Sequence, residues 1–395
     1  MEAAPVIAGA VAPEDHSRVE REQTPLAYLV IVRKGPSWKP ADLEPLCRLL
    51  SKRFAGEVWA FGSYDADIRV DRFRVRVVNE QRASRQVARL FLVTREILRW
   101  AVELRAARIR DLAIVSLEPF NSGLLGLYVA WRSGAIFICE VNGVYSNRNN
   151  YAAGMAGWLR FATRRVLGAC VLSHATAVRL LFKDQLLGYV RLPARVITRC
   201  FFDITHIERF YAGAEENMIL GVGFPFSVKG FDILCRAFHV IAARFPEWKL
   251  VLIGHNVPEE VHAAGLEHPH IETRPGVLQP ELAEWMSRCA IFALPSRTEG
   301  MGRVLIEAGA AGKCRVASRV DGIPTVVDDG VDGLLVPKED VDELAVALAR
   351  LIDDPPLRRR LGDAARLRVH REFSGDAYLQ HYSELVSSAL AQRRT

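Results

Sequence analysis

The residues best suited to chemistry follow a short apolar run, Ala290–Leu294, which reads as a buried strand. The run ends at Pro295, two glycines then flank Met301, and apolar residues recur at helical spacing from Val304 onward. A strand, a glycine-containing loop and a helix start leave free backbone N–H groups at the positive end of the helix dipole. This segment therefore predicts a binding site for a phosphate or a similar anion.

Two carboxylates accompany this predicted anion site. Glu299 stands in the loop, and Glu307 lies eight positions later, inside the predicted helix. At about 1.5 Å of rise per residue, eight helical positions correspond to roughly 12 Å. The pair suits a ligand with hydroxyls at both ends and a diphosphate between them, which is the chemistry of a nucleotide-sugar. Two glutamates at this spacing also occur by chance, and a mere capping role for Glu299 stays open.

A lysine marks a second place where a strand leads into a helix. In the run Gly221–Gly230, Lys229 stands at the expected start of a helix. A cation there is able to neutralise the charge that develops on a diphosphate leaving group as a glycosidic bond breaks. A solvated lysine near a helix start is the alternative.

Composition limits the class of protein. The chain has 395 residues, half of them hydrophobic, and a net charge of +6. This length suits two domains, and no apolar run is long enough to cross a bilayer. The modest positive charge permits attraction to phosphates or anionic lipid but requires neither. The sequence carries no nucleic-acid recognition motif, so we expect no nucleic-acid partner.

The seven cysteines are scattered and form no C-x-x-C pair. This pattern indicates buried free thiols in a reducing compartment, and we expect a cytoplasmic protein. Residues 1–24 are polar and contain proline, which predicts a poorly ordered segment that is neither a signal peptide nor an anchor. His262, His268 and His270 lie in a polar stretch without a carboxylate or cysteine at ligand spacing, which favours a solvated loop over a metal site.

Alternating strands and helices must position these residues. The alternation runs in two series and favours parallel sheets covered on both faces, so the predicted fold class is α/β with two doubly wound domains. In the first series the predicted strands are 27–32, 56–60, 73–78, 112–116, 136–141 and 169–172, and the predicted helices are 40–53, 85–108, 121–132, 150–166 and 175–184. In the second series the predicted strands are 218–223, 249–254, 290–294, 315–318 and 333–336, and the predicted helices are 229–244, 279–287, 302–312, 340–352 and 355–371.

At this point the chain resembles the glycosyltransferases of the GT-B fold, family 4. The resemblance rests on the Glu299-x7-Glu307 pair in its setting and on the run Gly221–Gly230, and it is looser over the first 180 residues. It implies two Rossmann-like domains facing across a cleft. Residues 25–210 would form an acceptor domain and 211–375 a nucleotide-sugar domain, while 376–395 would form a helix that crosses back to the first domain.

The resemblance also implies an activity. The chain would be a retaining, metal-independent transferase that moves a sugar from a nucleotide-diphosphate-sugar donor to a hydroxyl of a glycan, a glycolipid or a small molecule. By family association we expect a role in polysaccharide or glycoconjugate assembly. No metal or other cofactor is expected, because cationic side chains and helix amides neutralise the phosphates in the family.

Site residues follow by position in the family's motifs. Lys229 would bind the diphosphate, Glu299 the hydroxyls of the donor sugar, and Glu307 the ribose hydroxyls. Asn142, after the strand at 136–141, stands where relatives often carry a histidine that contacts the transferred sugar; an ordinary turn residue is the alternative. The predicted catalytic residues are Glu299, Lys229 and Asn142. The predicted donor-binding residues are Glu307, Gly300, Met301, Gly302, Arg303, Gly223, Val277 and Gly35.

Two positions depart from the family's pattern. Phe224 stands where an arginine normally follows the glycine, and Asn142 cannot shuttle a proton near neutral pH. Arg303 and Lys313 are the cations that could compensate for the missing arginine. The second hypothesis is therefore a catalytically weak or inactive GT-B subunit that binds a partner transferase or a glycan. A nucleotide-sugar epimerase is a third, but the acid and base groups that it needs are not found in the sequence.

The stretch 82–108 carries a basic helix face. At 100° per residue, five arginines fall on one side, opposite an apolar side: Arg82, Arg85, Arg89, Arg95 and Arg99. Such a face could rest on anionic lipid beside a lipid-linked acceptor, at the inner face of the plasma membrane. A solvated arginine face is the alternative.

Overall fold

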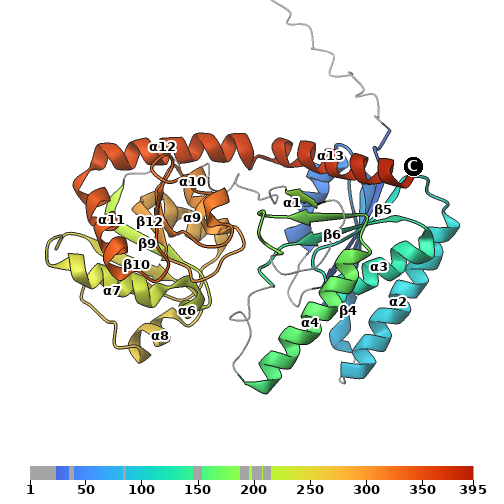
Figure 1. Cartoon of the computed structure of the whole chain (residues 1–395), viewed down its shortest axis with the longest axis horizontal. Coiled ribbons are helices and arrows are strands. Elements are labelled where there is room, and N and C mark those ends of the chain that lie inside the picture. Colours follow the sequence, from blue (N-terminus) through green and yellow to red (C-terminus); the bar gives the residue numbers. More distant parts are fainter. Residues whose placement is uncertain are drawn as a thin grey trace, which may run out of the picture.

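The computed structural model describes residues 24–34, 40–82, 86–145, 154–186, 195–197, 207 and 215–394. Within these residues the chain forms two sheets flanked by helices, and the two domains lie side by side (Figure 1). The predicted α/β class with two doubly wound domains is therefore confirmed. The predicted domain boundary at residue 210 and nearly all of the N-terminal segment 1–24 lie outside the described residues.

The first domain is built on an eight-stranded sheet with the strand order β3-β4-β2-β1-β5-β6-β7-β8. Its strands are β1 (Tyr28–Lys34), β2 (Ala55–Gly62), β3 (Ala66–Val70), β4 (Phe73–Asn79), β5 (Leu112–Ser116), β6 (Ile136–Val141), β7 (Ala177–Leu180) and β8 (Arg195–Ile197). Neighbouring strands are parallel except for β3, which is antiparallel to β4. Its helices are α1 (Pro40–Ser51), α2 (Gln86–Ala106), α3 (Asn121–Ser133) and α4 (Met155–Ser173), with a 3-10 turn η1 (Glu80–Arg82).

Alternation along the central strand β1 divides the first core into two layers. Leu29 and Ile31 face the layer that contains α1, whereas Val30 and Val32 face the layer that contains α2, α3 and α4. All four side chains are buried, which explains why β1 reads as a continuous apolar run.

The second domain is built on a six-stranded parallel sheet with the order β11-β10-β9-β12-β13-β14. Its strands are β9 (Glu216–Val222), β10 (Lys249–Ile253), β11 (Ile271–Arg274), β12 (Cys289–Leu294), β13 (Cys314–Ser318) and β14 (Leu334–Val336). Its helices are α6 (Phe226–Lys229), α7 (Phe231–Ala242), α8 (Val257–Ala263), α9 (Gln279–Arg288), α10 (Arg303–Ala310) and α11 (Val341–Asp353), with a 3-10 turn η3 (Ile323–Thr325). Apolar clusters cover both faces of this sheet.

Two consecutive helices at the C-terminus extend along both domains (Figure 1). Helix α12 (Pro355–Glu372) packs on the second domain through Leu357 and Leu361. Helix α13 (Gly375–Arg394) instead buries Tyr382 and Val386 in the core of the first domain. The chain therefore returns to the first domain at its end.

Two predicted elements of the first series are wrong. The predicted strand at 169–172 is the last part of α4, and the predicted helix at 175–184 contains strand β7 instead. A run of four apolar residues does not distinguish a buried strand from the buried end of a helix. In α4, Val171 and Leu172 are buried whereas Cys170 is exposed, which is the pattern of one helix face. The sequence pattern also does not indicate β3, α8 and β11, which are short and carry many polar residues.

Candidate active site

The strand order of the second sheet places a topological switch point between β9 and β12, which are neighbours in the sheet. In doubly wound sheets, ligands bind at the carboxyl ends of the strands beside such a point. Gly223 follows β9 there, and Pro295 follows β12. The two segments that the sequence singles out therefore leave the sheet next to one another.

Gly223 makes room for Lys229. Gly223 has a φ of 149°, and a Cβ at this position would lie 2.8 Å from Cε and 3.0 Å from Cγ of Lys229. The aliphatic part of the lysine side chain thus crosses directly over the glycine. This close approach fixes the position of the Lys229 ammonium group at the end of the short helix α6.

The structure brings two of the predicted catalytic residues together. Nζ of Lys229 forms a short ion pair with Oε2 of Glu299. The lysine and glutamate side chains are only 16% and 15% exposed, respectively. In place of the carboxylate, the ammonium can bind a phosphate oxygen. In place of the ammonium, the carboxylate can accept a hydrogen bond from a sugar hydroxyl.

Arg297 ties the loop after β12 to the segment that carries Lys229. Its guanidinium donates two hydrogen bonds of 2.8 Å to Asp232 and one of 2.6 Å to the carbonyl of Ser227, while its backbone N–H donates to Val228 at 2.8 Å. Burial alone would raise the pKa of Asp232, but the hydrogen bond and charge of Arg297 outweigh it and hold that pKa below its ordinary value.

The same loop is fixed from its other side by Asp321. The carboxylate accepts hydrogen bonds from the Thr298 hydroxyl at 2.6 Å and from the Glu299 backbone N–H at 3.0 Å. The backbone also approaches closely here, because a Cβ on Gly322 would lie 1.7 Å from the carbonyl oxygen of Gly300. The conformation that presents Glu299 is therefore held on both sides.

Helix α10 begins at Arg303, directly after this loop. Gly302 precedes it with a φ of 71° and, being a glycine, has no side chain that could cap the helix, while the backbone N–H of Leu305 donates to the Gly302 carbonyl at 2.8 Å. The side chain of Met301 is buried in the apolar core, so the residue can offer a ligand only its backbone. The start of α10 thus keeps the arrangement that suits an anion.

Glu307 lies inside α10 and is only 4% exposed. Arg303 donates a hydrogen bond of 2.8 Å to it, which supplies the partner that a buried carboxylate requires. The separation of roughly 12 Å expected from helical rise does not apply to the pair, because Glu299 precedes the helix and the chain from 299 to 302 is a loop.

Asn142 lies at the carboxyl end of β6 and is held on both sides of its amide. Nδ2 donates to the carbonyl of Leu117 at 3.2 Å, and Oδ1 accepts from Arg179 at 3.2 Å. Arg179, which is 1% exposed, also forms a 2.6 Å ion pair with Glu140, and the Tyr382 hydroxyl donates to Glu140 at 3.0 Å. Burial and the neighbouring carboxylate raise the pKa of Tyr382, so the phenol stays protonated.

The two domains meet beside Asn142. Its carbonyl oxygen lies 3.5 Å from the position of a Cβ on Gly300. Leu181 and Phe182, which follow β7, join an apolar cluster of the second domain that includes Met301. The structure therefore brings Asn142 of the first domain to the loop that carries Glu299.

The remaining predicted residues are less central. Val277 is half-buried in the loop after β11 and packs on the core of the second domain, while Gly35 lies outside the described residues. Phe224 is largely exposed, with its ring centroid 5.4 Å from that of His255. Lys313 cannot compensate for the missing arginine, because it precedes β13 at the opposite edge of the sheet and pairs with Glu215.

Sequence reasoning missed Arg297, Asp321 and the pair formed by Glu140 and Arg179. Arg297 lies inside the motif, but its partner Asp232 is 65 positions away. A signal for the buried pair exists, since β6 and β7 each carry one charge in an apolar strand. A charge at such a position needs a partner of opposite sign.

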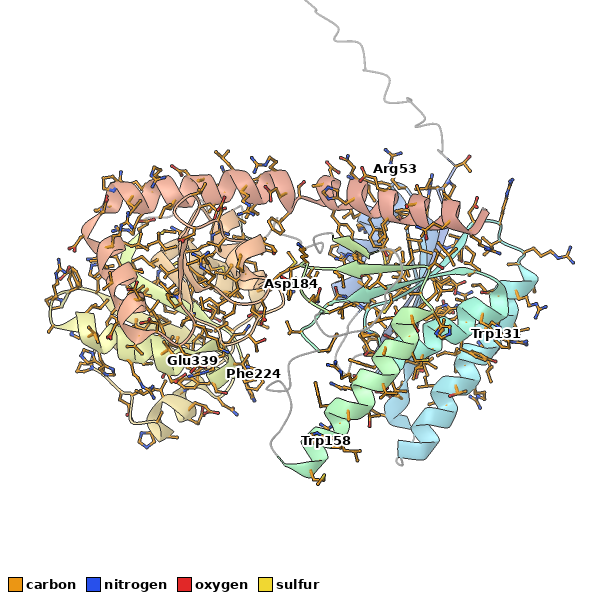
Figure 2. The ribbon with its side chains drawn as sticks, in the orientation of Figure 1. Arg53, Trp131, Trp158, Asp184, Phe224 and Glu339 are labelled. Carbon is orange, nitrogen blue, oxygen red and sulfur yellow. The ribbon has the colours of Figure 1, made fainter. Side chains whose placement is uncertain are left out.

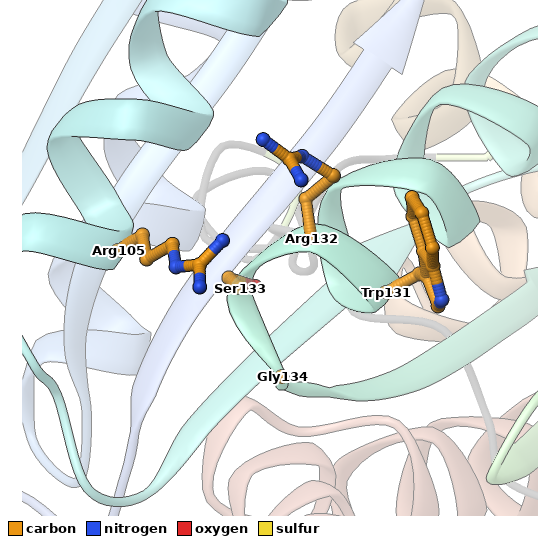
Figure 3. A pocket seen from close by; sticks show the side chains of 5 residues that line it. All are labelled: Arg105, Trp131, Arg132, Ser133 and Gly134. Atoms are coloured by element: carbon orange, nitrogen blue, oxygen red, sulfur yellow. The ribbon is translucent and has the colours of Figure 1, made fainter.

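Three further observations concern the rest of the molecule. In the part of the chain that the structure describes, no cluster of His, Cys, Asp and Glu side chains is arranged to hold a metal ion. None of the described helices combines the length and the hydropathy of a membrane span. A cavity of about 400 Å³ is lined by Arg105, Trp131, Arg132, Ser133 and Gly134 (Figure 3). It lies before β6, at the opposite edge from Asn142, and is thus separate from the site described above.

Comparison with known proteins agrees with this geometry. Residues 216–354 match the family described as Glycosyl transferases group 1. An uncharacterized glycosyltransferase of Haemophilus influenzae is 32% identical over 40% of this chain and 45% of its own length. The D-inositol 3-phosphate glycosyltransferase of Kribbella flavida is 38% identical over 38% of this chain and 39% of its own length. The chain thus matches less than half the length of these curated relatives.

Solved structures match over nearly the whole chain. Sucrose-phosphate synthase from Thermosynechococcus elongatus has a TM-score of 0.70 at 18% identity and covers 93% of this chain with 100% of its own. HepE of Anabaena, solved with UDP and glucose, has a TM-score of 0.69 at 17% identity and covers 92% of this chain with 100% of its own. The chain has the GT-B fold, and residues 216–354 of its second domain match the Glycosyl transferases group 1 family.

Proposed function

We propose that this protein is a retaining glycosyltransferase of family 4. It would move a sugar from a nucleotide-diphosphate-sugar donor to a hydroxyl of a glycan, a glycolipid or a small-molecule acceptor. The observation that carries the proposal is the Lys229–Glu299 pair at the switch point, beside the start of α10 that follows Gly302. Glu307 lies farther along the same helix.

Each group has a role that follows from its chemistry. Lys229 and the first amides of α10 bind the diphosphate and neutralise the charge that accumulates on it when the glycosidic bond breaks. Glu299 accepts hydrogen bonds from the donor sugar, and Glu307 from the ribose. Asn142 contacts the transferred sugar from the first domain. Cationic side chains and helix amides supply the positive field, so the proposed reaction uses no metal.

Retention of configuration is proposed from the family resemblance. In that mechanism the departing phosphate oxygen helps to take the proton of the acceptor hydroxyl, and no protein carboxylate forms a covalent intermediate. Glu299 has a place in this scheme as a hydrogen-bond acceptor for the hydroxyls of the donor sugar.

The setting is proposed from the names of relatives. HepE was solved with UDP and glucose, which supports a UDP-sugar as the first donor to test. The phosphatidyl-myo-inositol mannosyltransferase of Mycolicibacterium smegmatis, 31% identical over 46% of this chain and 47% of its own length, supports a lipid-linked acceptor. We therefore propose a role in polysaccharide or glycoconjugate assembly, in the cytoplasm and in peripheral contact with the inner face of the plasma membrane.

The test is a thermal-shift panel of UDP, GDP, ADP and their common sugars, followed by a donor-hydrolysis assay. A ligand that binds only the folded state raises the melting temperature by mass action. We expect one base to raise it most, and the rise to be smaller in Lys229→Ala. If no member of the panel shifts the wild-type protein, the proposal is refuted.

A second candidate function rests on Phe224 and Asn142. Phe224 puts an uncharged ring where the family carries an arginine, and Asn142 lacks the acid–base capacity of histidine. Both features favour a catalytically weak subunit that binds a partner transferase or a glycan. Nucleotide binding without turnover, over a range of acceptors, would support this second function against the first.

A further inference from the structure

We infer that the outer face of α4, together with that of α3, binds the surface of an anionic bilayer. The inference adds a membrane-binding surface to the proposed function. It rests on that function only for the proposal that the acceptor is linked to a lipid. It assigns the membrane contact to other helices than the arginine-rich stretch 82–108.

The apolar face of α4 is exposed. Met155, Trp158, Leu159 and Val166 are all more than half exposed, and their spacing places them on one side of the helix. Gly157, Gly168, Val171 and Leu172 form the buried side, toward the first sheet. Helix α4 therefore presents four large apolar side chains that the fold leaves uncovered.

The neighbouring helices continue this apolar surface. Helix α3 packs between α2 and α4. It exposes Leu124, Tyr128 and Trp131 at helical spacing, and α2 exposes Leu98 and Val102 one turn apart. Together the three helices carry nine of the seventeen exposed large hydrophobic side chains found among the described residues. Figure 2 shows Trp131 and Trp158 at separate places on this layer of helices.

The charges of α3 and α4 are complementary to an anionic surface. The two helices contain no Asp or Glu, and they carry Arg132, Arg160 and Arg165, besides Arg164, whose guanidinium lies over the ring of Phe120. Arg160 and Arg165 fall on the two flanks of the apolar face of α4. Tryptophan and arginine beside apolar side chains suit the boundary between lipid headgroups and acyl chains. Neither of these two helices therefore presents a carboxylate that an anionic surface would repel.

The arginines of α2 are less suited to this role. Arg95 pairs with Glu96 at 2.9 Å, and Arg99 lies 3.3 Å from Glu96 and 3.5 Å from Glu103. Their charge is therefore partly balanced within the helix itself. The side chains of Arg82, Arg85 and Arg89 lie outside those that the structure describes.

The position of α4 connects this surface to the candidate active site. Helix α4 lies between the parallel strands β6 and β7, so its first turn stands at the carboxyl edge of the sheet. Asn142 leaves the sheet at that same edge. Figure 1 shows the start of α4 projecting beyond the rest of the first domain. A bilayer held against Met155 and Trp158 would thus lie on the side from which an acceptor reaches Asn142.

The experiment is sedimentation of the full chain with vesicles of neutral phosphatidylcholine or of phosphatidylcholine with 30% phosphatidylglycerol. The wild-type protein is expected to bind the anionic vesicles at least tenfold more tightly than the neutral ones. The double variant Trp158→Gln/Leu159→Gln and the variant Arg160→Gln should each weaken this binding. The matched control is Val346→Gln/Leu367→Gln, which removes two exposed apolar side chains of the second domain and should bind as the wild type does.

Three results would overturn the inference. They are failure of the wild type to bind either vesicle, equal binding to both vesicles, and unchanged binding of the Trp158/Leu159 variant. A dimer in sedimentation velocity that dissociates in this variant would also overturn it, in favour of a second copy of the chain. Thermal shifts with nucleotides separate the two proposals, because the variant should keep the wild-type shift. Vesicle binding without any nucleotide shift would leave this inference standing and refute the proposed function.

Discussion

Replacement of Gly223 by alanine tests whether the position of Lys229 governs donor binding. An added Cβ would lie 2.8 to 3.1 Å from Cε, Cγ and Cδ of Lys229. Favourable contacts between carbon atoms lie at about 3.5–4.0 Å, so the lysine side chain must move by roughly 0.5–1 Å or leave the glycine altogether. Either movement disturbs the ion pair with Glu299, on which the proposed diphosphate site depends.

The variant also carries a backbone cost that must be separated from this effect. Gly223 has a φ of 149°, where a side chain is disfavoured. Gly330 provides the matched control, because it has a φ of 74° and no heavy atom within 4 Å of an added Cβ. A sparsely populated backbone conformation costs an alanine about 1–3 kcal/mol, so both variants should melt several degrees below the wild type.

Only Gly223→Ala should change the site. We expect its dissociation constant for the preferred nucleotide diphosphate, measured by isothermal titration, to rise about tenfold, which corresponds to about 1.4 kcal/mol. Its turnover should fall further, toward the hundredfold loss typical of a removed electrostatic stabiliser. Gly330→Ala should keep wild-type values of both. Wild-type affinity and turnover in Gly223→Ala would refute the role assigned to Lys229.

The remaining predictions concern other parts of the network. Lys229→Ala and Glu307→Gln should each lower turnover by about two orders of magnitude, and normal steady-state rates in both would contradict the assigned roles. Arg179→Met should cost about 3–5 kcal/mol of stability in urea unfolding because it leaves Glu140 buried without its cation, and adding Glu140→Gln should recover part of that loss. The pKa of Asp232 is lower in the folded protein than its ordinary value of 3.8. The ionised carboxylate therefore stabilises the fold fully above pH 3.8, and this contribution is lost as the pH falls through the pKa of the folded state. Asp232→Asn should therefore lower the melting temperature at pH 7 but make it less sensitive to acid below pH 4, and parallel pH profiles would argue against this linkage.

The second domain could be predicted well from its sequence because its signals are local. Pro295, Glu299 and Glu307 belong to one strand–loop–helix segment, and the fold class follows from the apolar alternation around it. What could not be predicted is how the loop is held. Asp232 contacts Arg297 from 65 positions away, and only the pairing of β9 with β12 brings these segments together.

The first domain was harder to predict because its site depends on packing. Asn142 is positioned by Leu117 and by Arg179, which are 25 and 37 positions away. Glu140, which shares Arg179, is itself bound by Tyr382, 242 positions from Glu140. The misassigned elements at 169–184 lie in the same region. Strand β7, which carries Arg179, falls inside the stretch predicted as a helix, so the charge of Arg179 is not recognised as one inside a buried strand.

The charged groups of the candidate site are paired in a way that bears on the proposed sugar transfer. Lys229 is paired with Glu299, and Glu307 with Arg303. The Lys229–Glu299 pair is already largely withdrawn from water, so the free energy of desolvating Lys229 was spent during folding. A diphosphate that replaces Glu299 as the partner of Lys229 would not have to desolvate this cation again. The displaced carboxylate is then free to accept from sugar hydroxyls. A site arranged in this way needs little reorganisation when negative charge grows on the leaving group, which is the condition under which fixed charges stabilise a transition state most strongly.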